Sequence, residues 1–158
     1  MDRPADTIAD NELLIERVFE ASPDLLFRLW TDPVHVVRWY GPQGFDCPHF
    51  EADLQPGGRW RGCIRSDNQG ELWMGGTYRE IRPGRRIVFT FRWDHDEAVG
   101  DTVVTIDFLD EGDGRTRQVF HQAPFKTVEQ RDSHVGGWTS AFACQDSYLQ
   151  QTTGKARP

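Results

Sequence analysis

The sequence predicts an α+β domain in which a curved antiparallel sheet wraps around one long C-terminal helix. Three observations lead to this fold class. Six strand-like runs follow one another between residues 45 and 122, and short turn signals separate them. Two short helix signals precede these runs, between residues 22 and 40. Residues 127–151 are the only segment long enough to form a major helix.

The N-terminal elements follow from local signals. Residues 12–19, ELLIERVF, are rich in Leu, Ile, Val and Phe and predict a strand. Residues 22–24, Ser-Pro-Asp, provide an N-cap, a proline at the first helical position and an acid in the first turn. They predict a short helix that runs to about Trp30. Residues 31–33, Thr-Asp-Pro, repeat the signal and predict a second short helix ending near Trp39-Tyr40, where a Gly-Pro pair follows.

The six strand-like runs form an antiparallel meander, because only short loops join them. The predicted strands are residues 45–54, 59–65, 71–81, 86–93, 102–109 and 115–122. Alternation places large apolar side chains on one face of the central strands: Ile87, Phe89, Phe91 and Trp93, and then Val104, Ile106 and Phe108. These faces need a cover. At about 1.5 Å per residue the last helix exceeds about 30 Å, enough to cross the sheet, so we expect a helix-grip arrangement.

The last helix has an apolar stripe with two unusual features. Thr127 and Gln130 fit a capping box at its start, and Val135, Trp138, Phe142 and Leu149 share one face at helical spacing. Gln145 lies at the centre of that stripe, and His134 lies close to it. Gly136 and Gly137 stand inside the helix, where each costs about 1 kcal/mol relative to Ala. A helix that covers a cavity accounts for these features better than one that fills a core.

Composition limits the classes of function. The 158 residues predict a single domain over residues 12–151, with flexible tails at 1–11 and 152–158. A formal net charge of −7 argues against nucleic-acid and anionic-membrane partners, and no apolar run reaches membrane-spanning length. The N-terminus lacks the regions of a signal peptide. Three widely spaced cysteines indicate free thiols, so we expect a cytoplasmic protein.

Six short motifs stand in the order in which they occur in a known superfamily. They are RVFEASP at 17–23, WTDP at 30–33, RWYGP at 38–42, PGGRW at 56–60, GTYREI at 76–81 and GW at 137–138. The chain therefore resembles the START-like (SRPBCC) superfamily, which includes the birch-pollen allergen and the polyketide cyclases. Within it, the chain is most similar to the family named after the C-terminal domain of the activator of the heat-shock-protein-ninety ATPase.

The resemblance implies a hydrophobic cavity between the sheet and the long helix. Members of the superfamily bind lipids, hormones or polyketides, and a few catalyse cyclisation or hydrolysis. The leading expectation is therefore a domain that binds a small, mostly apolar molecule. A cochaperone-like module that contacts a chaperone is the first alternative, and an enzyme of cyclase or hydrolase type is the second. The resemblance implies no cofactor, and it leaves the oligomeric state open, a homodimer included.

Ten residues are predicted to line the cavity: Trp60, Phe91, Trp93, Phe108, Gln118, Phe120, Gln122, Trp138, Phe142 and Gln145. The relatives usually carry apolar residues where Gln118 stands and often His where Gln122 stands. If Phe120 faces the cavity, a period of two places both glutamines there. Buried amides need partners, so the glutamines either bond one another and trapped water or meet polar groups of a ligand. We expect Gln118, Gln122 and Gln145 to point into the same interior space.

The other candidate motifs are explained more simply by a structural role or by exposure to solvent. Residues 39–42, Trp-Tyr-Gly-Pro, predict either a gate at the cavity mouth or, preferably, a structural helix stop. Residues 94–97, Asp-His-Asp-Glu, contain metal-ligand types, but acidic loops are usually only solvated, so no metal site is predicted. No nucleophile motif occurs, and no catalytic residue is predicted. His134 and Glu80 are the nearest candidates for an acid or a base.

Overall fold

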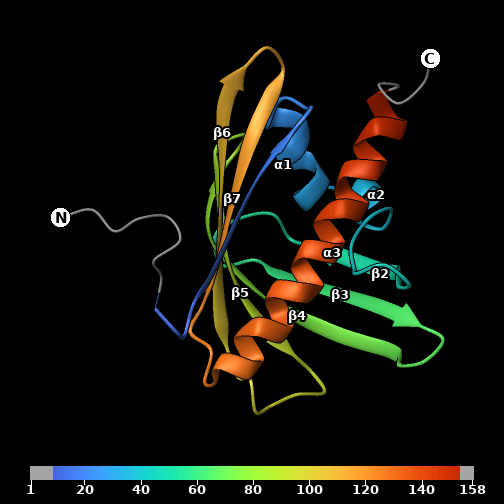
Figure 1. Cartoon of the computed structure of the whole chain (residues 1–158), viewed down its shortest axis with the longest axis vertical. Coiled ribbons are helices and arrows are strands. Elements are labelled where there is room, and N and C mark those ends of the chain that lie inside the picture. Colours follow the sequence, from blue (N-terminus) through green and yellow to red (C-terminus); the bar gives the residue numbers. More distant parts are fainter. Residues whose placement is uncertain (1–8, 154–158) are drawn as a thin grey trace.

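The computed structural model describes residues 9–153, which form a seven-stranded antiparallel sheet with one long helix across its face (Figure 1). The strand order is β1-β7-β6-β5-β4-β3-β2, so only the pairing of β1 with β7 joins strands distant in sequence. The elements are β1 (Leu13–Phe19), α1 (Pro23–Thr31), α2 (Pro33–Val36), β2 (Asp46–Ala52), β3 (Arg59–Ser66), β4 (Gly70–Arg82), β5 (Arg86–Trp93), β6 (Thr102–Gly112), β7 (Arg115–Ala123) and α3 (Val128–Thr153).

The predicted fold class and order of elements are confirmed, because capping and strand signals are local. The Ser22 hydroxyl accepts a hydrogen bond from the Leu25 amide at 3.1 Å, and the Thr127 hydroxyl accepts one from the Gln130 amide at 3.0 Å. The second helix ends earlier than predicted, at Val36. Its continuation to Tyr40 is a turn, in which the Val36 carbonyl accepts hydrogen bonds from the amides of Trp39 and Tyr40.

The predicted tails fall largely outside the described residues, since positions 1–8 and 154–158 are not described. Of their described parts, residues 10 and 11 form a turn, and residues 152 and 153 continue helix α3. Within residues 9–153, no helix combines the length and hydropathy that crossing a bilayer requires.

The sheet bends sharply at β4, so that β2, β3 and the first part of β4 lean away from the plane of β6 and β7 (Figure 1). The β4–β5 register shifts between Tyr78 and Glu80. Close approach of the strands at this bend requires glycine, because a Cβ atom at Gly76 would overlap the carbonyl oxygen of Thr90 on β5.

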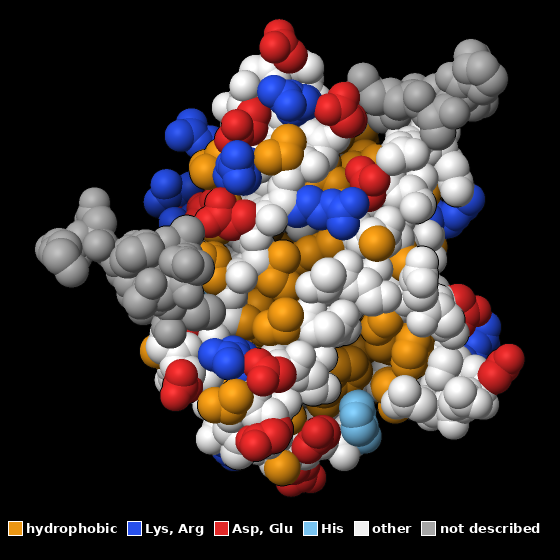
Figure 2. All heavy atoms as spheres, viewed as in Figure 1, with side chains coloured by type: hydrophobic (Ala, Val, Ile, Leu, Met, Phe, Trp, Pro, Cys, Tyr) orange, Lys and Arg blue, Asp and Glu red, His pale blue; other side chains and the backbone are white. Residues whose placement is uncertain are grey.

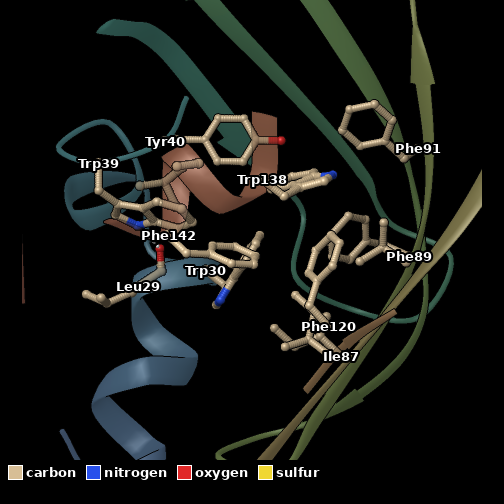
Figure 3. Close-up of a cluster of buried hydrophobic side chains, with 14 of the residues drawn as sticks. Leu29, Trp30, Trp39, Tyr40, Ile87, Phe89, Phe91, Phe120, Trp138 and Phe142 are labelled. Carbon is tan, nitrogen blue, oxygen red and sulfur yellow. Dashed lines mark hydrogen bonds between the residues drawn. The ribbon is translucent and has the colours of Figure 1, made fainter. Parts of the chain in front are cut away.

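Trp30, on α1, lies at the centre of the core between the sheet and α3 (Figure 3). Its indole ring has centroid distances of 4.9 to 6.5 Å to five other aromatic rings, those of Trp39, Tyr40, Phe120, Trp138 and Phe142. These five rings come from the turn after α2, from β7 and from α3. The short helices therefore fill the half of the space beneath α3 that lies over β6 and β7.

The three predicted glutamines are all buried, with at most 1% of their surface exposed. Gln118 on β7 and Gln145 on α3 exchange two amide hydrogen bonds of 3.2 and 3.1 Å. The Oε1 atom of Gln118 also accepts a hydrogen bond of 2.8 Å from the indole N–H of Trp30. One polar cluster thus joins α1, the sheet and α3.

Gln122 belongs to a separate polar contact. Its Oε1 atom accepts a hydrogen bond of 2.8 Å from the indole N–H of Trp138, and its amide nitrogen donates one of 2.8 Å to the hydroxyl of Thr102. The three glutamines therefore all point inward between sheet and helix, but they form two hydrogen-bonded groups within the protein. Their partners are protein atoms, which meets the requirement that buried amides be paired.

We expect Gln145→Met to lower the free energy of unfolding by about 1–3 kcal/mol, because it leaves the buried amide nitrogen of Gln118 without an acceptor, while the Gln118 oxygen keeps its bond from Trp30. Gln150→Met is the control, since Gln150 is an exposed residue of the same helix whose side chain donates a hydrogen bond to Asp146. Urea denaturation followed by tryptophan fluorescence measures both. An unchanged unfolding midpoint for Gln145→Met would contradict the importance of this cluster.

Candidate functional site

A cleft of about 270 Å³ lies between the N-terminal half of α3 and the bent part of the sheet. Its apolar wall is formed by Tyr40, Pro42, Phe45, Ile64, Leu72, Met74, Phe91, Trp93, Trp138 and Ala141. Its polar residues are Gln69, His95, Asp96, Ser133 and His134. Figure 2 shows hydrophobic side chains at the base of this hollow between α3 and the β3–β4 hairpin. The cleft opens to solvent.

Segment 40–45 closes one side of the cleft because it is anchored to α3. The amide of Gln43 donates a hydrogen bond of 2.9 Å to the hydroxyl of Ser140. A Cβ atom at Gly137 would lie 4.0 Å from the ring of Pro42, so this glycine leaves the space between helix and segment open. Gly136 is exposed, and its Cβ position has no atom within 4 Å. The glycine pair therefore has a spatial role only at Gly137.

Three of the ten predicted site residues line the cleft: Phe91, Trp93 and Trp138. Trp60 lies beside a smaller void of about 10 Å³. The other six pack in the closed core on the Trp30 side of the molecule: Phe108, Gln118, Phe120, Gln122, Phe142 and Gln145. The physical reason is the indole of Trp30, which fills the space in front of the β7 residues.

Loops and the turn after α2 also contribute residues to the cleft, and these were not among the ten predicted site residues. Tyr40 and Pro42 belong to the segment for which a structural stop was preferred over a gate. Trp39 is buried and donates its indole N–H to the Leu29 carbonyl at 2.9 Å, as a structural stop requires, while the next three residues line the cleft. The Trp-Tyr-Gly-Pro sequence was the available signal. His95 and Asp96 carried no signal beyond their acidic loop.

His134 is fixed at the cleft by both of its ring nitrogens. The Nδ1 atom lies 2.7 Å from the Gln130 carbonyl oxygen, and the indole N–H of Trp93 donates to Nε2 at 3.0 Å. This pattern requires the neutral ring with its proton on Nδ1. Burial lowers the pKa of His134 below its ordinary value of 6.5, and the Gln130 carbonyl and Asp96 oppose that shift only in part.

Glu80, the other residue considered as an acid or base, lies outside the cleft. Its carboxylate pairs with Arg82 at 2.6 Å and with Arg86 at 3.7 Å. The cleft therefore contains His134 but not Glu80.

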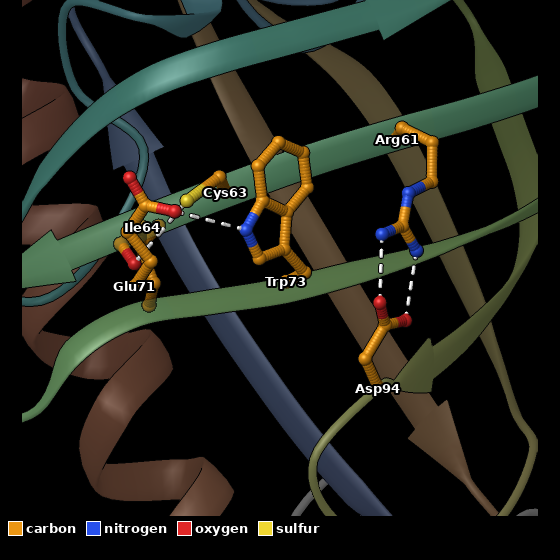
Figure 4. A network of polar contacts seen from close by, with 6 residues as sticks. All are labelled: Arg61, Cys63, Ile64, Glu71, Trp73 and Asp94. Carbon is orange, nitrogen blue, oxygen red and sulfur yellow. Dashed lines mark hydrogen bonds and ion pairs between the residues drawn. The ribbon is translucent and has the colours of Figure 1, made fainter.

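A second polar network lies on the face of the sheet opposite α3 (Figure 4). Arg61 binds Asp94 through two hydrogen bonds of 2.8 and 2.7 Å, and its guanidinium group lies 5.2 Å from the ring centroid of Trp73. This pairing lowers the pKa of Asp94. Over residues 9–153, no group of three or more His, Cys, Asp or Glu side chains could hold a metal ion. All three cysteines are free.

A sequence model of the family described as "Activator of Hsp90 ATPase homolog 1-like protein" matches residues 20–150, most of the chain. The chain belongs to this family. Its membership of the START-like superfamily agrees with the helix-grip fold and with the cleft beside the long helix. A comparison with curated proteins gave no significant match.

Solved bacterial structures share the fold of this member of the AHSA1-like family. A protein from Chromobacterium violaceum is 27% identical with a TM-score of 0.77, and the match covers 87% of this chain and 96% of that one. One from Nitrosomonas europaea is 20% identical with a TM-score of 0.78, covering 94% and 99%. The AHSA1 protein from Silicibacter pomeroyi is 23% identical with a TM-score of 0.77, covering 89% and 99%.

The lowered pKa of His134 predicts a loss of stability in mild acid. The unfolded chain binds a proton near pH 6.5 while the folded chain resists it, so stability falls as the pH drops below about 6.5 and is unaffected above. Between about pH 7.5 and pH 5.5, we expect the melting temperature of the wild type to fall by about 2–4 °C more than that of His134→Gln.

Thermal denaturation at the two pH values measures this difference. His49→Gln is the control, because His49 is on the outer face and pairs with Glu51, leaving the contact between His134 and Trp93 intact. If His134→Gln loses as much stability in acid as the wild type, the predicted link between the lowered pKa of His134 and acid stability is wrong.

Proposed function

We propose that this protein binds a small, mostly apolar molecule in the cleft between α3 and the bent part of its sheet. One observation carries the proposal: the space of about 270 Å³ has a wall built largely of aromatic and aliphatic side chains and an opening to solvent. Pockets that bind small molecules have this composition, with a few polar groups that fix orientation. Membership of a START-like family supports the same reading.

The size of the cleft limits the ligand. An apolar cavity of about 150 Å³ in another protein is large enough to bind benzene. A space of about 270 Å³ therefore suits a body of about two fused rings or a similarly compact aliphatic group. Phe91, Trp93 and Trp138 line this space, and aromatic rings pack favourably against such a body.

Ligand binding accounts for the cleft better than catalysis does. His134 is one of three titratable residues of the cleft, with His95 and Asp96 of the loop after β5, and both of its ring nitrogens are held by protein partners. A base at Nε2 would first have to break the hydrogen bond from Trp93. The proposal therefore gives His134 and Trp93 the role of a fixed wall.

Filling the cleft with a side chain from α3 should weaken binding. We expect Gly137→Leu to weaken binding of the neutral fluorescent probe N-phenyl-1-naphthylamine at least about tenfold, because the added side chain occupies space next to Pro42. Gly136→Leu is the matched control: the same substitution on the same helix turns an exposed residue into leucine outside the cleft. Probe fluorescence gives the affinities, and circular dichroism checks the fold.

Failure of the probe to bind the wild type, or equal affinity for both leucine variants, would contradict the proposed cleft.

The family description favours a second candidate function, contact with an Hsp90-type chaperone. This function predicts that the protein co-purifies with the chaperone and accelerates its ATP hydrolysis. The ATPase rate measured with and without the protein separates the two functions. An unchanged rate and no retention on immobilised chaperone would remove the second candidate.

A further inference from the structure

Tyr40 places a polar group deep in the apolar wall of the cleft. Its side chain is held rigidly, since its ring packs against Trp30, Trp39 and Trp138 at centroid distances of 6.5, 5.6 and 6.0 Å. Only 7% of the residue is exposed. The hydroxyl group points past Trp138 toward Phe91, and both of these residues also line the cleft (Figure 3).

This hydroxyl group forms no hydrogen bond with any residue of the described chain. The other polar groups of the aromatic core behave differently. The indole N–H groups of Trp30 and Trp138 donate to glutamine oxygens, each at 2.8 Å. Within residues 9–153, Arg86 Nε is the one buried side-chain polar atom without a partner, so the unpaired Tyr40 hydroxyl is accessible from the open space of the cleft, where a ligand can complete its hydrogen bond.

Tyr40 is available as a donor. Burial raises its pKa well above the ordinary value, and the nearby side chains of Cys47 and Tyr78 raise it further. The group therefore stays protonated at neutral pH, and its O–H can donate to an acceptor on the ligand.

The charges around the cleft oppose an anion. In the part of the chain that the structure describes, no Lys or Arg lines the cleft, and the carboxylate of Asp96 stands at its edge. The whole chain has a formal net charge of −7. A carboxylate bound among these aromatic residues would lose its hydration without gaining a cation.

We infer that the cleft selects neutral molecules that carry a carbonyl or similar acceptor on a compact aromatic or alicyclic body, and that Tyr40 donates the hydrogen bond that orients them. The inference rests on the proposed binding function and narrows it. It excludes carboxylates as ligands, and it makes Tyr40 the specificity-determining residue.

Three probes with one skeleton test the inference: 2-acetylnaphthalene has a neutral acceptor, 2-naphthoate a negative charge, and 2-ethylnaphthalene no polar group. Calorimetry or tryptophan quenching gives their affinities for the wild type and for Tyr40→Phe. We expect the ketone to bind tightest, the naphthoate at least about tenfold more weakly, and Tyr40→Phe to lose about 3- to 10-fold for the ketone alone. The carbonyl stretch of the bound ketone should shift to lower wavenumber in the wild type only.

Tyr78→Phe is the matched control, because Tyr78 is another buried tyrosine that lies outside the cleft. The outcomes separate the two proposals. If none of the probes binds the wild type, the proposed function fails and the inference with it. If 2-ethylnaphthalene binds but Tyr40→Phe leaves ketone affinity and the carbonyl stretch unchanged, the binding function stands and the role of Tyr40 is overturned. Equal affinity for ketone and naphthoate overturns the selection for neutral molecules.

Discussion

The hydrogen bond from the indole of Trp30 to Gln118 is the contact on which the arrangement of the core depends. Gln118 in turn exchanges two hydrogen bonds with Gln145, so the short helix, the last strand and the long helix share one buried polar cluster. Each polar group of the cluster is paired. The hydrogen bonds therefore fix the orientation of these side chains, which aromatic packing alone, being weakly directional, would not do. It fixes where the Trp30 ring lies, and that ring closes the space beneath the C-terminal half of α3.

The cleft lies next to this closed region, where the space beneath α3 is not filled. Where Trp30 fills the space, the helix and the sheet meet through packed side chains. Where the sheet bends away at β4, the segment from Tyr40 to Phe45 closes one side of the space beneath α3. The same chain therefore contains a dense half with every buried amide paired and an open half with an unpaired tyrosine hydroxyl.

Sequence reasoning predicted the elements well, because capping residues, alternation and turn signals act over a few residues. It also predicted that Gln118, Gln122 and Gln145 point inward, since the strand period and the helix period settle their faces. It did not foresee that Trp30 would supply a partner for Gln118, because that contact joins residues 88 positions apart. The position of the cleft could not be predicted from the sequence either. It depends on how a turn docks on a helix and on where a strand bends, and neither is encoded in a local pattern.

The separation of the polar core cluster from the cleft has a consequence for divergence within the family. Cleft residues of the loop after β5, such as His95 and Asp96, form no contact with the Trp30, Gln118 and Gln145 cluster, whereas Tyr40 packs against Trp30 itself. Substitutions at these loop positions can then accumulate without a large loss of stability, since sites without shared partners contribute nearly additively. A fold divided in this way can exchange one ligand for another over evolutionary time while its core remains under separate selection.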